Sequence, residues 1–483
     1  MKMLVDNQWV DASDKGTMPV RNPGTGEEID RVPKATLEDM QRVIAAAQKG
    51  KGAMRRLTAL QRYQMLNKIA ENIDSRVSEL GHLLAQENGK PILQTRAEVA
   101  VTANIFRGFA EEAKRIFGRV MPVDAVRGGE RHFAITIRQP LGVVAAIVPF
   151  NYPVELWGHK AAAALAAGNA LISKPPSACP LTLLKIAALM EECGLPPYAH
   201  QMVTGPGAVI GDFLARSDGI QLVTVTGSTE VGVRIAQLGA EHLKKIHMEL
   251  GGNDALIILS DCDIEKAAEA VVLGRLARGN GQICCAVKRI FVEASIHDQF
   301  ADLLTQKAKA LKMGDQLQED TDVGPLINEQ AAKEVESFVN GAIKAGATLR
   351  TGGHRQAAFY EPTVLTNVHP DMVMFKEEVF GPVAPLVPFE DIEDAIRMAN
   401  DSPYGLQSAV FTRDINKALQ IAYKLEAGGV IINWSSALRV ETLPFGGIKM
   451  SGHGREGVHD TLDEMTDQKT IVVHNAFPEP DGE

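Results

Sequence analysis

The chain has 483 residues, which is too many for one compact core, so it should divide into two or three domains. Its formal net charge of −10 at pH 7 argues against nucleic acid or an anionic membrane as a partner, and no apolar run approaches the roughly 20 residues of a membrane span. The first eight residues lack the apolar core of a signal peptide, and the five cysteines follow no disulfide or zinc pattern, so we predict a protein of the reducing cytoplasm without a metal site.

The N-terminal third is predicted to be mainly helical. Residues 1–34 are rich in turn formers and suggest a short strand and an arm. Residues 36–39 resemble a capping box, and helical periodicity then continues with breaks to about Phe117. Arg107 lies in this region, and we include it among the candidate substrate residues, although a lone charge on a helix most often faces solvent.

Two strand-like segments stand outside the rest of the pattern. Residues 131–138 alternate like a half-buried strand, and residues 469–474 form a second isolated apolar segment. Because exposed strand edges are seldom left unpaired, we expect these segments to pair with each other or with another subunit. We therefore assign residues 126–141 and 460–483 to oligomerisation strands.

From residue 141 to about 250, strands and helices alternate. Such alternation is typical of a parallel, doubly wound sheet, which binds nucleotides at the carboxyl ends of its strands. A second α/β pattern runs from residue 254 to about 430 and predicts a second domain. The predicted strands are 143–148, 170–173, 200–203, 222–225, 255–258, 289–292 and 409–411, and the predicted helices of the first pattern are 157–167, 181–192, 209–215 and 231–238.

Three strand ends carry residues suited to a nucleotide. The strand ending at 203 is followed by Gly205-Pro206-Gly207 and, four residues on, Gly211, a spacing one residue longer than the usual dinucleotide pattern. The strand ending at 225 leads into residues 226–232, a second glycine turn with hydroxyls. A third ends in Lys174 and Ser177. Glycines allow close approach of a phosphate to a helix N-terminus, but a plain structural turn and a surface lysine are the alternatives.

A cysteine pair follows a flexible turn. Residues 263–278 are patterned like a helix, residues 289–292 like a strand, and Gly279-Asn280-Gly281 between them presents Cys284 and Cys285. Loops held by regular elements often carry catalytic groups. A free cysteine is, however, more often a small buried hydrophobe than a nucleophile, so the turn alone leaves both interpretations open.

Seven motifs, in order, resemble those of the aldehyde dehydrogenase superfamily over nearly the whole chain. They are residues 149–153 (PFNYP), 174–175 (KP), 225–229 (VTGST), 249–252 (ELGG), 281–284 (GQIC), 377–382 (EEVFGP) and 444–447 (PFGG). The resemblance implies an α/β fold with two Rossmann-like doubly wound parallel-sheet domains and a small β oligomerisation element. We expect a dinucleotide-binding domain from residues 1–125 and 142–249, and a catalytic domain from residues 250–440.

The resemblance also implies roles for three residues. Cys284 aligns with the nucleophile that attacks the aldehyde and forms a thiohemiacetal and then a thioester. The Asn151 amide, with the Cys284 backbone N–H, is expected to bind the oxyanion, and Glu249 to activate the hydrolytic water. Glu249 favours release of the free acid, because relatives that transfer the acyl group to coenzyme A typically lack it. Cys285 is expected to pack beside the nucleophile.

The cofactor is expected to be NADP, with NAD possible. Many NAD-specific relatives carry glutamate where this chain has Ser177; its absence removes repulsion of a 2′-phosphate, and Lys174 can pair with one. Glu378 and Phe380 match positions that hold the nicotinamide ribose and ring. The candidate cofactor residues are Val148, Pro149, Phe150, Lys174, Ser177, Gly207, Gly211, Gly227, Ser228, Gly232, Leu250, Glu378 and Phe380.

The substrate is predicted to be a small hydroxylated or anionic aldehyde, similar to lactaldehyde. The chain resembles two subgroups, the lactaldehyde dehydrogenases and the non-phosphorylating glyceraldehyde-3-phosphate dehydrogenases. Ile283 stands where the phosphate-specific enzymes have arginine, and His159 stands roughly where succinate-semialdehyde enzymes have arginine. Both aldehydes remain alternatives. The candidate substrate residues are Arg107, Trp157, Ile283, Cys285 and Arg439, and Trp434 is a further possible pocket wall.

Two rival classes remain at this stage. One is a cysteine esterase that uses Cys284 and Glu249 without a cofactor, which the glycine turns and Lys174 count against. The other is a binding protein on a retired enzyme scaffold, which the intact set of Asn151, Glu249 and Cys284 counts against. The family resemblance and the two isolated strands together predict a homodimer or homotetramer.

Overall fold

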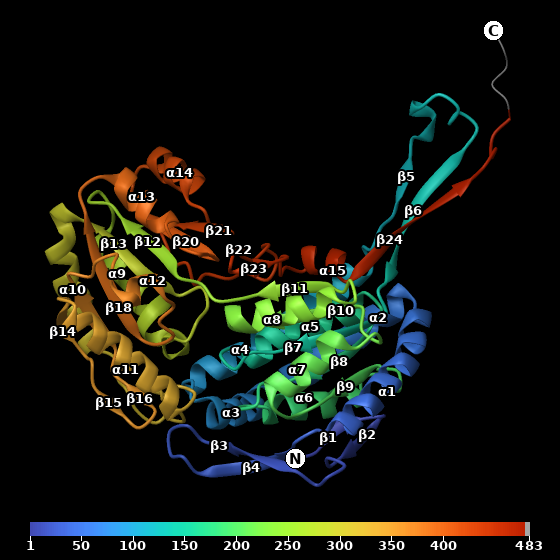
Figure 1. Cartoon of the computed structure of the whole chain (residues 1–483), viewed down its shortest axis with the longest axis horizontal. Coiled ribbons are helices and arrows are strands. Elements are labelled where there is room, and N and C mark those ends of the chain that lie inside the picture. Colours follow the sequence, from blue (N-terminus) through green and yellow to red (C-terminus); the bar gives the residue numbers. More distant parts are fainter. Residues whose placement is uncertain (479–483) are drawn as a thin grey trace.

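A computed structural model describes residues 1–478 of the chain. Two sheets of mainly parallel strands lie in two lobes, and a three-stranded arm projects from one of them (Figure 1). Of the described residues, no helix has both the length and the apolar composition to cross a membrane. The last five residues of the predicted oligomerisation segment 460–483 lie outside the described residues.

The N-terminus forms two hairpins, where the sequence suggested a short strand and an arm. The first hairpin extends the first sheet, because β1 pairs with β9. The second hairpin stands apart as a two-stranded sheet. The strands are β1 (Met3–Val5), β2 (Gln8–Val10), β3 (Thr17–Arg21) and β4 (Glu28–Pro33).

Four helices follow, as the periodicity predicted. The predicted capping box is present: the Thr36 hydroxyl accepts from the Asp39 backbone N–H, and the Asp39 carboxylate accepts from the Thr36 N–H. Thr58 and Gln61 repeat the arrangement at the second helix. The apolar faces of α2, α3 and α4 pack into one core with α5 and α6, whereas most of the apolar face of α1 packs into a second core of the first sheet. The helices are α1 (Leu37–Arg56), α2 (Ala59–Asp74), α3 (Val77–Asn88) and α4 (Ile92–Ala113).

The first sheet has the order β2-β1-β9-β8-β7-β10-β11-β23. Its five central strands are parallel, and the chain order reverses between β7 and β10, which is where such sheets bind ligands. The central strands are apolar because helices cover both faces. The elements are β7 (Val143–Ile147), α5 (Pro153–Ala166), β8 (Ala170–Lys174), α6 (Leu181–Glu191), β9 (His200–Met202), α7 (Gly207–Arg216), β10 (Leu222–Thr226), α8 (Thr229–Ala240) and β11 (Lys245–Glu249).

The second sheet, β14-β17-β18-β13-β12-β20-β21, is parallel except for its edge strand β14. Its last five strands have the same relative order as the parallel strands of the first sheet. The elements are β12 (Asp254–Ile258), α9 (Ile264–Val271), β13 (Val287–Glu293), η4 (Ala294–Ile296), α10 (His297–Lys309), α11 (Glu329–Lys344), β14 (Thr348–Thr351), β15 (Arg355–Gln356), β16 (Phe359–Tyr360), β17 (Thr363–Thr366), α12 (Val373–Lys376), β18 (Val383–Phe389), α13 (Ile392–Asn400), β19 (Tyr404–Gly405), β20 (Gln407–Phe411), α14 (Ile415–Lys424) and β21 (Gly429–Ile432).

The predicted helix 263–278 changes its winding before the cysteines. It is α-helical to Val271, π-helical in η2 (Val272–Ala277), and ends in a short turn, η3 (Arg278–Gly281). Gly279, Asn280 and Gly281 all have positive φ, at 58°, 54° and 73°. Glycine and, after it, asparagine adopt this left-handed conformation more readily than other residues, so the Gly-Asn-Gly sequence suits the turn.

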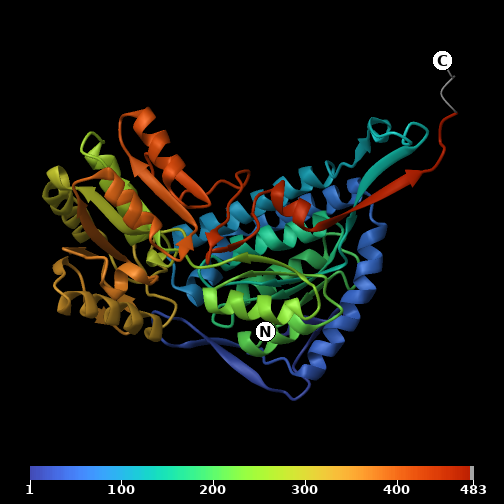
Figure 2. The ribbon, with the colours of Figure 1, turned by 45° about the horizontal axis from the view of Figure 1, so that its top comes forward.

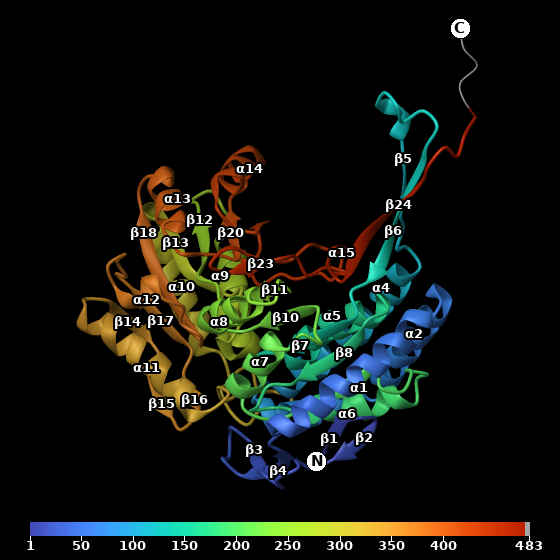
Figure 3. The ribbon, with the colours of Figure 1, turned by 45° about the vertical axis from the view of Figure 1, so that its right-hand side comes forward.

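The arm contains β6 (Phe133–Pro140) between β24 (Thr466–Val473) and β5 (Arg119–Met121), and η1 (Val123–Ala125) lies near its tip. β6 and β24 pair antiparallel along their whole length, which confirms the expectation that the two isolated strands pair with each other. Figures 2 and 3 show the arm standing away from both lobes. The C-terminal part also includes β22 (Ile448–Lys449), β23 (Gly452–His453) and α15 (Asp460–Glu464).

The two parallel-sheet lobes and the β arm confirm the predicted fold class. Apart from the N-terminal strands, six strands of these sheets were not predicted, namely β11, β14, β17, β18, β21 and β23. β5 lies in the range assigned to the dinucleotide-binding part but pairs with β6 of the arm. After the second lobe, the chain returns and β23 pairs with β11 of the first sheet.

Candidate active site

A cavity of about 530 Å³ opens at the carboxyl ends of β7 and β10. It lies where the strand order reverses, and residues after β8 and β11 extend its wall. Of the thirteen candidate cofactor residues, eleven line it, and Cys284 and Asn151 lie at its inner end. The eleven are Val148, Pro149, Phe150, Lys174, Ser177, Gly207, Gly227, Ser228, Leu250, Glu378 and Phe380.

Lys174 and Ser177 are joined at this cavity. The Lys174 ammonium donates to the Ser177 hydroxyl at 3.1 Å, and that hydroxyl donates to the Gly205 carbonyl at 2.9 Å. Burial lowers the pKa of Lys174 to about 8. The side chain is therefore mostly charged at pH 7, and a phosphate on a ligand would increase its charge further.

The polar groups of the cavity fit a dinucleotide. Helix α7 begins at Gly207 without a side-chain cap, so its first backbone N–H groups are free to bind an anion. The Thr226 hydroxyl is buried on the cavity wall and has no hydrogen-bond partner among the described residues. A ligand that brings phosphates and hydroxyls can satisfy these groups.

Gly211 and Gly232 do not line the cavity, contrary to their assignment as cofactor residues. A side chain on Gly232 would lie 2.5 Å from Leu250, and one on Gly211 would lie 3.5 Å from Ile235. Gly232 therefore allows α8 to pack closely against Leu250, whereas the space beside Gly211 would accept a small side chain. Of the glycines in these two turns, Gly207 and Gly227 line the cavity.

At the inner end of the cavity, Lys288 joins the cysteine turn to Glu378. Its ammonium donates to the Cys284 carbonyl and lies 2.9 Å from Glu378 Oε1. Glu378 also accepts from the Gly252 backbone N–H at 3.2 Å. Phe380 meets Phe150 edge to face at 5.8 Å. These contacts set a carboxylate and an aromatic ring beside Cys284.

A second, much smaller cavity of about 30 Å³ lies on the other side of Cys284. Of the described residues, Asn151 and Cys284 are the only ones that line both cavities. Three of the candidate substrate residues, Ile283, Cys285 and Arg439, line the small cavity. Its wall is completed by Tyr152, Glu155, Leu156, Arg278 and Ala437.

The two neighbouring thiols affect each other. A hydrogen bond with Cys285, together with burial, raises the pKa of the Cys284 thiol. Lys288 and Arg439 act in the opposite direction and favour its thiolate.

Asn151 lies at the same junction. Its side-chain amide makes no hydrogen bond within the described residues, so it is available to a ligand.

Glu249 lies at the end of β11, outside the walls of both cavities. Its carboxyl is buried, 3.8 Å from His247 Nε2, and neither oxygen has a hydrogen-bond partner among the described residues. Burial and the Glu456 carboxylate raise the pKa of Glu249 well above its ordinary value.

A buried charge cluster surrounds Glu249. Glu456 accepts from Lys160 at 2.6 Å and from Arg439 at 2.6 Å. Burial alone would raise the pKa of Glu456, but these two cations hold it well below its ordinary value. Arg439 is thus already paired, and it also stacks over Phe445 at 4.4 Å. His159 beside the cluster is neutral, because burial lowers its pKa.

Arg278 is a cation of the small cavity that the sequence did not single out. Its guanidinium donates to the Ala437 carbonyl at 3.0 Å and lies over the Tyr152 ring at 5.6 Å. Tyr152 and Glu155 raise the pKa of Arg278, although burial opposes them. No hydrogen bond or ion pair to a carboxylate is found for it in residues 1–478.

Two candidate substrate residues, Arg107 and Trp157, line neither cavity. Arg107 lies on α4 outside both cavities and pairs with Asp74. Both side chains are partly exposed, so Arg107 is a charge on a solvent-facing side of the helix, which was the alternative interpretation. Trp157 is fully buried in the first core, where its indole N–H donates to Ser173 at 2.9 Å. Trp434 packs against the core of the second lobe and lines neither cavity.

The arrangement suits covalent chemistry on a carbonyl compound. A thiol stands between a cavity that fits a dinucleotide and a small cavity that fits a short substrate, with an amide donor at the same junction. The described residues contain no group of three or more His, Cys, Asp or Glu side chains placed to hold a metal ion.

Comparison with known proteins agrees with this geometry. Residues 9–471 match the profile of the Aldehyde dehydrogenase family. The chain is 40% identical over 473 residues to a 3-sulfolactaldehyde dehydrogenase of Priestia aryabhattai, covering 98% of both chains. It is 38% identical to a lactaldehyde dehydrogenase of Methanococcus vannielii over 98% of this chain and 100% of the relative. A mitochondrial succinate-semialdehyde dehydrogenase of Oryza sativa is 40% identical, over 98% and 89% of the two chains.

Solved structures with the same fold include an NADP-dependent enzyme of E. coli, with a TM-score of 0.95, 35% identity and 98% of both chains covered. Another is betaine aldehyde dehydrogenase of Staphylococcus aureus in complex with NAD⁺, with a TM-score of 0.94, 34% identity, and 99% and 96% coverage. Fold, cavities and comparisons together show that the chain belongs to the aldehyde dehydrogenase family. It is an NAD(P)-dependent oxidoreductase that acts on an aldehyde.

Proposed function

We propose that the chain oxidises a small aldehyde to the carboxylic acid through a covalent adduct on Cys284. The observation that carries the proposal is the junction of the two cavities, which Cys284 and Asn151 alone share among the described residues. A panel of aldehydes, assayed with NAD and with NADP by the absorbance of the reduced nicotinamide, tests it. Ester hydrolysis faster than every cofactor-dependent turnover would instead favour a cysteine esterase.

The residues divide the work as follows. The Cys284 thiolate attacks the carbonyl carbon and a C–S bond forms, while the carbonyl oxygen becomes an oxyanion. The Asn151 amide and the Cys284 backbone N–H donate to that oxyanion, and one such donor is worth about 3–4 kcal/mol. NAD(P), when bound, accepts a hydride from the substrate carbon.

The adduct is then a thioester, which Glu249 helps to hydrolyse. Glu249 takes a proton from water, the water oxygen bonds to the acyl carbon, and the C–S bond breaks to release the acid and the Cys284 thiolate. The raised pKa of Glu249 makes its carboxylate a stronger base than an exposed one. Lys174, Ser177 and Glu378 line the larger cavity and would hold the cofactor.

For the substrate, we propose a short aldehyde with an anionic group, a carboxylate or a sulfonate. The small cavity leaves room for few atoms, and Arg278 on its wall makes no ion pair with a carboxylate in residues 1–478. Two of the relatives are named for anionic aldehydes, 3-sulfolactaldehyde and succinate semialdehyde. A third is named for lactaldehyde, which is uncharged and remains the alternative.

We expect Arg278→Leu to lower kcat/KM for succinate semialdehyde by about ten- to hundredfold, since a hydrogen bond to a charged group contributes about 1.5–3 kcal/mol. For lactaldehyde the change should stay within about threefold, because no charge is lost. Steady-state kinetics on both aldehydes measure the difference. Arg278→Lys serves as the charge-preserving control, and equal losses on both substrates in Arg278→Leu would contradict an anion-binding role.

For the cofactor, we propose NADP preference with NAD as a second substrate. Ser177 hydrogen-bonds to Lys174 and brings no negative charge to the cavity, so a 2′-phosphate meets an ammonium and a hydroxyl. One structural relative is described as NADP-dependent and another holds NAD⁺, so the fold itself accepts both.

We expect Ser177→Glu to reverse the preference. A carboxylate here would pair with Lys174 and repel a 2′-phosphate, so kcat/KM with NADP should fall by at least about tenfold, which is the free-energy scale of one charged hydrogen bond. With NAD it should stay within about threefold or rise. Kinetics with both cofactors at saturating aldehyde measure this, and Ser177→Ala is the control without charge. An unchanged NADP to NAD ratio would refute the role of Ser177.

We further propose that the arm joins subunits in a homodimer or homotetramer. Apolar side chains of the arm are exposed, among them Val120, Met121, Val472 and Val473. The outer edge of β24 is also unpaired among the described residues, and such an edge favours pairing with another chain.

For localisation, we propose the reducing cytoplasm. All five cysteines are free thiols, which is compatible with that compartment.

A further inference from the structure

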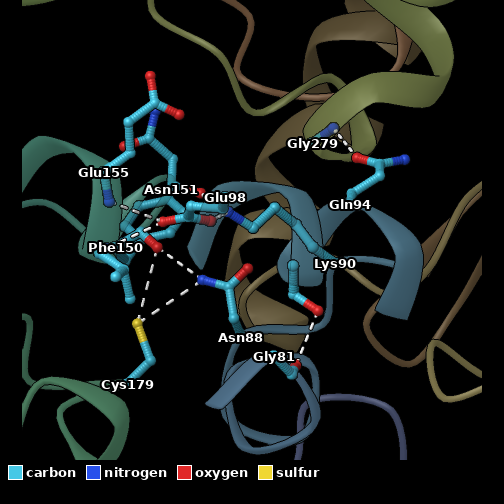
Figure 4. A network of polar contacts seen from close by, with 12 residues as sticks. Gly81, Asn88, Lys90, Gln94, Glu98, Phe150, Asn151, Glu155, Cys179 and Gly279 are labelled. Atoms are coloured by element: carbon cyan, nitrogen blue, oxygen red, sulfur yellow. Dashed lines mark hydrogen bonds and ion pairs between the residues drawn. The ribbon is translucent and has the colours of Figure 1, made fainter. Parts of the chain in front are cut away.

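A group of residues at the end of α3, in the link to α4 and in the first turns of α4 contacts both halves of the active site without lining either cavity. Its residues are buried or half-buried, and Figure 4 shows Asn88, Lys90, Gln94 and Glu98 between the Phe150–Asn151 loop and the Gly279 turn. We name this group the clamp, defined as Asn88, Gly89, Lys90, Gln94 and Glu98.

The clamp holds the loop that carries Asn151. The Asn88 amide donates to the Phe150 carbonyl at 2.6 Å, and the Lys90 ammonium donates to the Asn151 carbonyl at 2.7 Å. Lys90 also pairs with Glu98 and lies over the Tyr152 ring at 3.8 Å. With both neighbouring carbonyls fixed, the peptide planes on either side of the Asn151 Cα have little freedom to turn.

Glu98 fixes the other end of the same loop. Helix α5 begins right after Asn151, and its N-cap residue Tyr152 provides no side-chain cap. Instead the Glu98 carboxylate accepts from the backbone N–H groups of Val154 at 2.9 Å and Glu155 at 3.3 Å. A carboxylate at this position satisfies free donors of the first turn and complements the positive end of the helix.

The same group of residues holds the turn that carries Cys284. The Gln94 side chain accepts from the Gly279 N–H at 2.7 Å and donates to the Ala277 carbonyl at 3.3 Å. The Gly89 carbonyl accepts from the Asn280 amide at 3.0 Å. Gly279 and Asn280 are two of the three residues with positive φ, so these hydrogen bonds act on the turn itself.

We propose that the clamp sets the position of the Asn151 amide relative to the Cys284 thiol. The proposal rests on the function proposed above, in which both groups act on one carbonyl. Clamp residues touch neither cavity, so they are positioning residues that act through Asn151 and the cysteine turn. Misplacing a reacting group by about 1 Å can cost on the order of a hundredfold in rate, so small shifts matter.

The test is a double-mutant cycle of Lys90→Met with Asn151→Ala. If Lys90 acts through Asn151, Lys90→Met should lower kcat by about thirtyfold alone but by less than about threefold in the Asn151→Ala background. The KM for aldehyde and the Kd for NADP should remain close to those of the parent enzyme. Losses that multiply would overturn the clamp while leaving the proposed function in place.

Two controls separate positioning from general damage. Thr95 lies on α4, as Gln94 and Glu98 do, and its buried hydroxyl donates to the carbonyls of Gly81 and Ile92. Thr95→Val removes these hydrogen bonds, so it should lower Tm but leave kcat within about twofold. The rate of Cys284 alkylation by iodoacetamide needs no oxyanion donor and should not change in Lys90→Met. A parallel fall in alkylation rate, or an equal loss of kcat in Thr95→Val, would overturn the clamp.

A third comparison covers failure to fold. Lys90→Met leaves the buried Glu98 carboxylate unpaired, so Lys90→Met/Glu98→Gln replaces it in the cycle if the single variant does not fold. Its effect on kcat alone and in the Asn151→Ala background is interpreted in the same way.

Full kcat in Asn151→Ala would overturn both the oxyanion role of Asn151 and the clamp that acts through it.

Discussion

Cys284→Ala should show no measurable aldehyde oxidation, while Cys285→Ala should keep at least about a third of the parent kcat. Removing a nucleophile typically costs on the order of 10⁵-fold or more, because the covalent route is lost. Cys285 lines only the small cavity, whereas Cys284 lies at the junction of both. Cys285→Ala also removes the hydrogen bond that raises the pKa of Cys284.

The measurement is cofactor reduction with the preferred aldehyde, and Tm and cofactor affinity serve as controls for folding. Because Cys285→Ala lowers the pKa of Cys284, its alkylation by iodoacetamide should reach the maximal rate at a lower pH than in the parent. Equal loss of turnover in both variants, with folding intact, would mean that the nucleophile has been assigned to the wrong thiol.

Glu249→Gln should leave the first turnover and slow the later ones. Without a base for the hydrolytic water, the thioester should accumulate, so mixing enzyme, aldehyde and cofactor should give a burst of about one equivalent of reduced cofactor. Steady-state kcat should fall by about 10²–10⁴-fold, the usual contribution of a general base. Stopped-flow absorbance resolves the burst, and mass spectrometry of the quenched enzyme detects the acyl group.

The pH profile gives an independent check of this role. Because the pKa of Glu249 is raised, its carboxyl loses its proton at a higher pH than an exposed glutamate does, and only the deprotonated form can act as a base. The parent kcat should therefore rise with pH as the carboxyl loses its proton, and Glu249→Gln should lose that rise. A variant that shows neither burst nor turnover would place Glu249 before the thioester and contradict hydrolysis as its step.

Local sequence patterns predicted most of the fold but missed strands whose identity depends on their neighbours. β18 carries Pro385 and Pro388, and proline weakens any strand signal, yet β18 pairs with β13 and β17 inside the second sheet. β11 alternates polar and apolar residues, including Lys245 and His247, and its strand conformation is supported by parallel pairing with β10. Such pairing is a tertiary effect that a short window of sequence cannot show.

The same limit applies to the site. Residues in glycine turns and loops at strand ends, such as Lys174 and Gly227, were predicted from the chain because their chemistry is local. Arg278 was not, since its place on the cavity wall depends on the π-helical winding before it. The clamp was missed for a similar reason, because Lys90 and Asn151 are 61 residues apart.

The pairing of two cavities at a two-residue junction has a consequence for how such a protein can diverge. Under the proposed function, a mutation in the wall around Arg278 or Ala437 alters only the cavity proposed for the aldehyde, so it should change which aldehyde is accepted and leave the proposed cofactor cavity intact. Selection can therefore change the aldehyde specificity and the cofactor preference of such an enzyme separately. Separate change of the aldehyde cavity is consistent with the names of three relatives. They are named for a sulfonated, an uncharged and a carboxylated aldehyde, and each is near 40% identical to this chain.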